Sequence, residues 1–142
     1  MIRIVKTREV AASVDQIWDL ISNLEDETRY WPVIKSTRIL SRSLNKIERE
    51  ATILRGPMGN VKSIQTLLLK PKKSLTLQMT KGPLIGTRTI ILDPIGRGRA
   101  RIDIVWKFDL EGIPAFAESF VRNNISDLTE KALAMISKRV EG

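Results

Sequence analysis

Six short runs of alternating residues in the middle of the chain constrain its fold more than any other feature. The connections between them are too short to cross a sheet, so the strands are expected to pair as an antiparallel meander. In the last run Ile102 and Trp106 share one face and Arg101 lies on the other, which indicates one buried and one largely wet face. The runs cover residues 33–42, 46–55, 61–70, 74–81, 86–93 and 99–110.

One further strand and two short helices are expected before this meander, and one long helix after it. Residues 2–10 read as the strand, and Ser13 is expected to cap the first helix because a glutamine follows at capping-box spacing. A second short helix is expected at about 24–30, ended by Pro32. After its opening proline, the segment 114–139 contains neither Gly nor Pro and carries an apolar stripe at helical spacing. It predicts one long C-terminal helix that runs the length of the sheet.

The order of these elements resembles the START-like, pollen-allergen-like helix-grip superfamily (SRPBCC). This superfamily includes lipid-transfer domains, polyketide cyclase/dehydrase-like proteins and coenzyme Q-binding proteins. The resemblance is also carried by Val14-Asp15-Gln16-Ile17-Trp18-Asp19-Leu20-Ile21 and by Tyr30-Trp31-Pro32.

The resemblance covers nearly the whole chain, but its motifs are short and mark the fold rather than a reaction. It implies an α+β helix-grip fold, in which a curved seven-stranded antiparallel sheet wraps around the long C-terminal helix. It also implies one domain over residues 1–142 and a cavity between the sheet and that helix.

The chain contains no cysteine and no histidine. This composition excludes disulfides, thiolate metal sites, histidine-bearing zinc sites and Ser-His-Asp triads. Any catalysis would rest on Asp, Glu, Lys, Tyr, Ser or Thr, and the sequence identifies no catalytic residue. We expect no metal and no cofactor.

The net charge of +8 and the sequence pI near 10.1 suggest an anionic partner, although a well-solvated surface is the simpler explanation. The first residues lack the features of a signal peptide, and no run approaches the roughly 20 apolar residues of a membrane span. A cytoplasmic location is therefore expected.

Alternate turns of a meander lie at the same end of the sheet. The turns at 56–60 and 82–85 should therefore meet the junction at 111–114, and all three carry apolar residues. Apolar loop tips often mark a ligand portal or an interaction surface. The alternative is that these side chains fold back into the core. The portal candidates are Met58, Leu84, Ile85 and Ile113.

The turns at 43–45, 71–73 and 94–98 should gather at the other end, which is rich in Lys and Arg. Such an end is suited to anionic phospholipid head groups. Nucleic acid is a poorer fit, because aromatic residues make up only 5% of the chain and occupy apolar periodic positions. The residues proposed to meet an anionic membrane are Lys72, Lys73, Arg97 and Arg99.

Residues on apolar faces are the candidates for the cavity wall, although plain core packing is the alternative for each of them. Asn124 stands in the apolar stripe of the long helix, where a buried amide needs a partner, unless the stripe rotates and leaves it on the wet edge. The candidate ligand-binding residues are Leu77, Met79, Trp106, Phe108, Phe116, Phe120 and Asn124.

Other polar residues on the strands are ambiguous. Ser63 and Gln65 share a face, and alternation does not show whether that face is the inner or the outer one. Glu48 and Glu50 form a carboxylate pair, but Arg49 lies on the opposite face, so the strand reads as charged on both faces and solvated.

The sequence thus favours binding or transport of a hydrophobic small molecule or lipid in an internal cavity. One alternative is an enzyme of the polyketide cyclase/dehydratase type that works without His or Cys. Another is binding of an anionic membrane or nucleic acid through the basic end.

Overall fold

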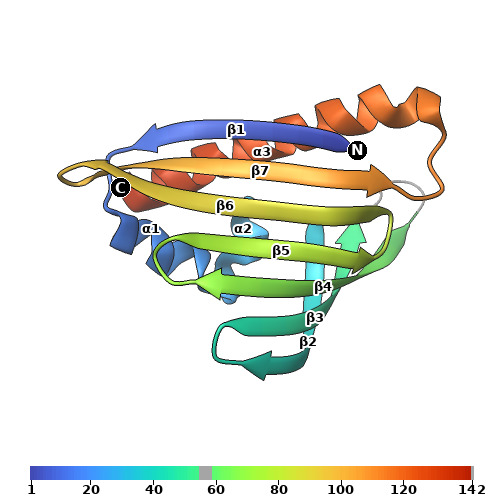
Figure 1. Ribbon diagram of the computed structural model, residues 1–142, viewed down its shortest axis with the longest axis horizontal. Helices are drawn as coiled ribbons and strands as arrows, with labels where there is room; N and C mark the ends of the chain where they lie inside the picture. Colours follow the sequence, from blue (N-terminus) through green and yellow to red (C-terminus); the bar gives the residue numbers. More distant parts are fainter. Residues whose placement is uncertain (55–58, 142) are drawn as a thin grey trace.

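The computed structural model describes residues 1–54 and 59–141. These residues form a curved seven-stranded antiparallel sheet in the order β1-β7-β6-β5-β4-β3-β2 (Figure 1). The predicted meander is therefore confirmed, and β1 adds to its far edge by pairing with β7. The strands are β1 (Ile2–Val10), β2 (Ile34–Ser43), β3 (Lys46–Leu54), β4 (Asn60–Lys70), β5 (Ser74–Lys81), β6 (Leu84–Gly96) and β7 (Arg99–Leu110).

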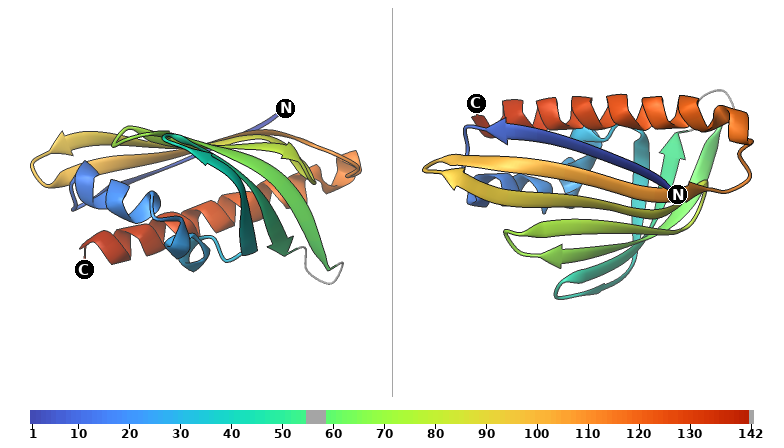
Figure 2. Two further views of the ribbon diagram at one scale, coloured as in Figure 1. Left: turned by 90° about the horizontal axis from the view of Figure 1, so that it is seen from below. Right: turned by 45° about the horizontal axis from the view of Figure 1, so that its top comes forward.

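The helices all lie on the concave side of the sheet (Figure 2). Ser13 caps α1 with the reciprocal hydrogen bonds of a capping box, as its spacing predicts. The second helix is shorter than expected, because its first residues form the 3₁₀ turn η1. The helical elements are α1 (Val14–Ile21), η1 (Leu24–Asp26), α2 (Glu27–Tyr30), η3 (Ala115–Ala117) and α3 (Glu118–Glu141).

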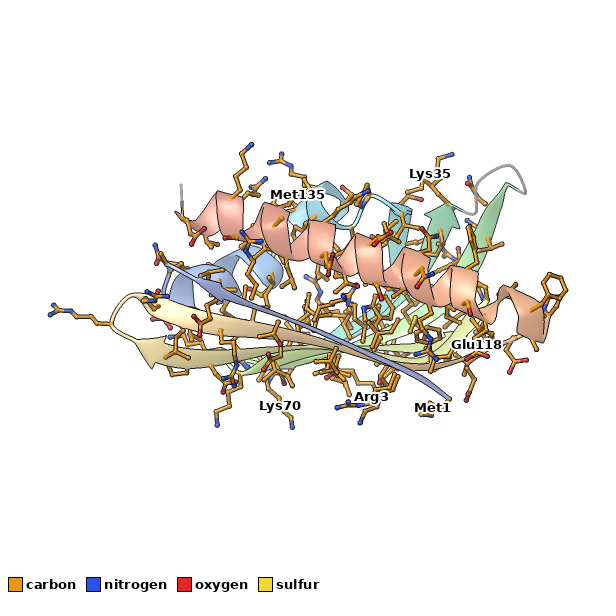
Figure 3. The ribbon with its side chains drawn as sticks, turned by 90° about the horizontal axis from the view of Figure 1, so that it is seen from above. Met1, Arg3, Lys35, Lys70, Glu118 and Met135 are labelled. Carbon is orange, nitrogen blue, oxygen red and sulfur yellow. The ribbon has the colours of Figure 1, made fainter. Side chains whose placement is uncertain are left out.

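The long helix starts later than the sequence suggests. Pro114 has an extended backbone (φ −60°, ψ 147°), and the 3₁₀ turn η3 separates it from α3. The first turns of α3 have no buried residue, and Phe120 is 73% exposed. Buried residues begin at Ile125 and continue to Ser137. Helix α3 therefore packs on the sheet with its C-terminal half, and its labelled start at Glu118 lies at the other end of the sheet (Figure 3).

Gly86 lets β6 and β7 approach each other closely. Its φ of +152° is a conformation that residues with a side chain rarely adopt. A Cβ at this position would lie 2.6 Å from the Cα of Phe108 and would overlap the carbonyl oxygen of Lys107. Because these are backbone atoms of a central strand, β7 would have to move to admit any side chain.

A buried ion pair ties α2 to the sheet. The guanidinium of Arg49 on β3 donates from Nη1 and Nη2 to the two carboxylate oxygens of Glu27 on α2, at 2.6 and 3.0 Å. The Nε of Arg49 donates to Oε1 of Gln65 at 2.9 Å, and the Gln65 amide donates to the hydroxyl of Ser63 at 3.2 Å. Arg49 is completely buried, so its charge depends on this carboxylate. The expectation that Arg49 belongs to a solvated strand face is wrong, because Glu27 provides a partner inside the protein.

Gly86→Ala is expected to lower the free energy of unfolding by about 3 kcal/mol, from backbone strain and from the collision with β7. Urea unfolding followed by circular dichroism measures this loss. Gly98→Ala is the matched control, because Gly98 also has a positive φ (+66°) but has open space around its Cα. The control should lose only about 1–2 kcal/mol. Equal losses in the two variants would show that the contact with β7 has no role.

Glu27→Gln is expected to cost about 3–5 kcal/mol, because it leaves two buried guanidinium groups without a carboxylate. The same urea titration checks it. Glu50→Gln is the control: Glu50 reaches Arg38 and Lys62 only at 3.7 and 3.8 Å, on the outer face. It should change stability by less than about 1 kcal/mol. A loss of similar size at both positions would contradict a special role for the buried pair.

Candidate functional site

A small chamber of about 80 Å³ lies against the inner face of the sheet. Its walls come from β2 to β7 and from the segment that follows α2. Three polar side chains, Ser63, Gln65 and Arg88, stand among apolar neighbours. We call this space the inner chamber, and it is lined by Trp31, Val33, Ile34, Ile53, Ser63, Gln65, Leu77, Met79, Pro83, Leu84, Arg88 and Trp106.

A larger cleft of about 570 Å³ separates the sheet from the first half of α3. It exists because that half of the helix does not pack on the strands. We call it the outer cleft, and it is lined by Val33, Leu54, Pro83, Leu84, Trp106, Gly112, Ile113, Pro114, Phe120, Val121, Asn124, Ile125 and Leu128. The two spaces adjoin, since they share Val33, Pro83, Leu84 and Trp106.

Several candidates from the sequence are brought together here. Leu77 and Met79 line the inner chamber, and Trp106 lines both spaces. Phe120 and Asn124 line the outer cleft. Of the portal candidates, Leu84 lines both spaces and Ile113 lines the cleft. Asn124 is exposed, so it lies on the wet edge of the helix, the alternative that the sequence left open.

Other candidates lie outside these spaces. Phe108 is fully buried beside Trp106, with ring centroids 6.1 Å apart, and packs in the core. Phe116 is 89% exposed, because it sits on η3, ahead of the helical stripe. Ile85 lines neither space, because it follows the inward-facing Leu84 on β6 and neighbouring strand residues face opposite sides. Met58 lies outside the described residues.

The most distinctive polar group of the chamber, Arg88, is not among the sequence candidates. It is 2% exposed, and its guanidinium carbon lies 4.6 Å from the ring centroid of Trp31 and 5.8 Å from that of Trp106. Its Nη2 reaches Oε2 of Glu27 at 3.8 Å, an ion-pair distance that is too long for a hydrogen bond. Burial lowers the pKa of Arg88, while the charge of Glu27 acts in the opposite direction.

The alternation of β6 does indicate that Arg88 faces the inside of the protein. Arg88 has the same parity on β6 as the buried Ile90 and Leu92. In the same way, Ser63 and Gln65 share their parity with the buried Leu67, and the structure places both of them on the inner face.

Trp106 is held in a fixed orientation between the two spaces. Its Nε1 donates to the hydroxyl of Thr129 on α3 at 2.9 Å, and that hydroxyl donates to the carbonyl of Ile125 at 2.7 Å. Its ring meets Trp31 edge-on, with centroids 5.9 Å apart. The indole is therefore a rigid part of the wall, anchored to both the sheet and the helix.

The lining residues are suited to holding a molecule more than to moving protons. Among the described residues that line the inner chamber there is no carboxylate, and Glu27 is already bound by Arg49. Tyr30 is buried but does not line either space, and burial together with the charge of Glu27 raises the pKa of its phenol. Within residues 1–54 and 59–141, no three acidic side chains are grouped so that they could hold a metal ion.

The basic end of the sheet is partly neutralised. The β2–β3, β4–β5 and β6–β7 turns do lie at one end, as parity predicts (Figure 1). Lys72 pairs with Asp15 at 3.4 Å and Arg99 pairs with Glu9 at 3.7 Å. Binding of an anionic membrane through Lys72, Lys73, Arg97 and Arg99 stays a prediction. No helix in the described part of the chain is long and apolar enough to cross a membrane.

Comparison with solved structures shows the same fold in distant proteins. Protein TTHA0849 from Thermus thermophilus aligns with a TM-score of 0.82 at 16% identity, covering 98% of this chain and 97% of the other. A START superfamily protein from Mycobacterium smegmatis aligns with a TM-score of 0.78 at 18% identity over 98% and 97%. The Zhui aromatase/cyclase from Streptomyces sp. R1128 aligns with a TM-score of 0.76 at 14% identity over 98% and 95%.

The sequence identities are too low to transfer a ligand or a reaction to this chain. The structural alignments establish that it has the helix-grip fold. A comparison with curated proteins found no match. The family model described as polyketide cyclase/dehydrase and lipid transport matches residues 1–141, almost the whole chain. Together with the shared fold, this match shows that the chain belongs to the polyketide cyclase/dehydrase and lipid transport family, within the START-like (SRPBCC) superfamily.

Proposed function

We propose that this protein binds a hydrophobic small molecule or lipid in the inner chamber and outer cleft together. The observation that carries the proposal is that the two spaces adjoin and that the residues lining both are apolar. The outer cleft alone, at about 570 Å³, lies within the size range of small-molecule sites, about 300–1,000 Å³. The family description, which includes lipid transport, is consistent with this function.

Burial of apolar surface supplies the driving force. A ligand group that buries about 200 Å², the area of one aromatic side chain, gains about 5 kcal/mol at about 25 cal/mol per Å². The loss of translational and rotational freedom on binding is set against this gain. Phe120 is largely exposed at the cleft, and a ligand that covers it would add to the buried area.

We further propose that the ligand enters through the outer cleft. The cleft lies at the end of the sheet where β7 connects to η3, and both Leu84 and Ile113 line it. Trp106, which is fixed by Thr129, lines both this entrance and the inner chamber.

A catalytic function of the cyclase/dehydratase type is less well supported by the site. Such a reaction needs a base or an acid next to the substrate. The described polar residues of the inner chamber are a serine, an amide and an arginine, and none of them is a base near neutral pH. The geometry therefore favours binding.

Native mass spectrometry of the purified protein tests the proposal directly. We expect a reproducible apolar adduct, which denaturing extraction would release and identify. If the protein carries no adduct and also takes up neither Nile red nor a fatty acid, the binding function is wrong.

Leu84→Trp is expected to weaken uptake of Nile red by about tenfold or more, because the larger ring fills the junction of the two spaces. Ile85→Trp is the matched control: it introduces the same side chain one residue later, where it lines neither space. Fluorescence titration of both variants, with circular dichroism to verify folding, measures the difference. Equal weakening by the two substitutions would argue against binding at this junction.

A further inference from the structure

The core beside the inner chamber holds an excess positive charge. Two guanidinium groups, Arg49 and Arg88, are buried there with one carboxylate, Glu27. Arg49 takes both oxygens of that carboxylate in short hydrogen bonds, and Arg88 reaches it only at 3.8 Å. One positive charge is therefore left without a full partner, in a place where burial of an unpaired charge is costly.

Two hydrogen-bond donors at the same place also lack an acceptor. Among the described residues, Nε of Arg88 and Nε1 of Trp31 are buried without a hydrogen-bond partner, and both residues line the inner chamber. The nearby polar side chains are already engaged, since Gln65 accepts from Arg49 and donates to Ser63. Buried donors are nearly always paired in folded proteins, so these two donors are suited to an acceptor that a ligand would bring.

The surroundings of Arg88 fit a site for a small anion. Trp31 and Trp106 lie near the guanidinium and stabilise its charge through their ring faces. Planar guanidinium groups bind carboxylates with matching geometry. The chamber of about 80 Å³ has room for only a few non-hydrogen atoms, which suits a carboxylate and the first carbons attached to it.

We propose that the ligand is an amphipathic monocarboxylate, whose carboxylate binds Arg88 in the inner chamber and whose apolar body occupies the outer cleft. This inference rests on the proposed binding function. A single negative charge matches the single excess positive charge, so a monoanion fits better than a dianionic phosphate. The larger volume of the cleft and its apolar lining match the body of such a molecule.

Matched acids and alcohols test the charge requirement on the unmodified protein. Isothermal titration calorimetry would compare octanoate, dodecanoate and hexadecanoate with the corresponding alcohols. At the best chain length, the acid should bind at least about tenfold more tightly, as expected for hydrogen bonds to a charged group. If acids and alcohols bind with equal affinity, the proposed binding function is supported and the anion inference is wrong. If neither class binds but Nile red is taken up, the anion inference is wrong and the proposed binding function is retained. If Nile red is not taken up either and no adduct is found, the proposed function fails and the inference fails with it.

Arg88→Met tests the residue, because it keeps a long apolar side chain and removes the charge and the donors. We expect the affinity for the acid to fall at least about tenfold, while the affinity for the alcohol stays within about twofold. Arg38→Met is the control, since Arg38 is exposed on β2 and should leave both affinities unchanged. An equal loss for acid and alcohol would show that Arg88 only supports the fold. Should Arg88→Met not fold, the comparison on the unmodified protein decides.

Discussion

The buried pairing of Glu27 with Arg49 is the interaction on which the rest of the site depends. It connects α2 to β3 through a bidentate contact, and Gln65 completes the hydrogen bonding of the arginine. Because Trp31 directly follows α2, the position of this pair also places the indole against Arg88. Arg49 binds both oxygens of the carboxylate that Arg88 would otherwise bind. The contact that ties α2 to β3 is therefore also the reason why Arg88 lacks a full partner.

The uneven packing of α3 determines where the cavity opens. Its C-terminal half buries Ala132, Leu133 and Ile136 in the core. Its first turns contribute walls to a cleft instead of residues to the core. The bond from Trp106 to Thr129 lies between these two halves and holds the sheet at a fixed distance from the helix. The space between the sheet and α3 is therefore closed where the helix packs on the strands and open where it does not.

Much of this architecture could be predicted from the sequence, because short turns and alternation are local signals. The same alternation identified Leu77, Met79 and Trp106, which do line the cavity. The solvated reading is wrong for Arg49, because a charged residue in a strand reads as solvated unless its partner is known. Arg88 is not among the sequence candidates for the same reason, although its parity matches the buried Ile90 and Leu92. That partner, Glu27, is 22 residues from Arg49 in the sequence, and only the folded chain brings the two together. The spacing of apolar residues predicts Phe116 in the helical stripe, because nothing local shows that a 3₁₀ turn precedes α3.

The position of Arg88 is also informative about what the fold has to do. A buried charge with an incomplete partner lowers stability, and an apolar residue of similar size would often make a more stable protein. The aromatic rings near its guanidinium offset part of this cost, but they accept nothing from its Nε. A bound carboxylate would remove the remaining cost, and a ligand that binds only the folded state stabilises that state. Arg88 therefore links ligand binding in the cavity to the stability of the fold. In a purely apolar cavity of the same shape, a ligand would stabilise the fold only by burying apolar surface.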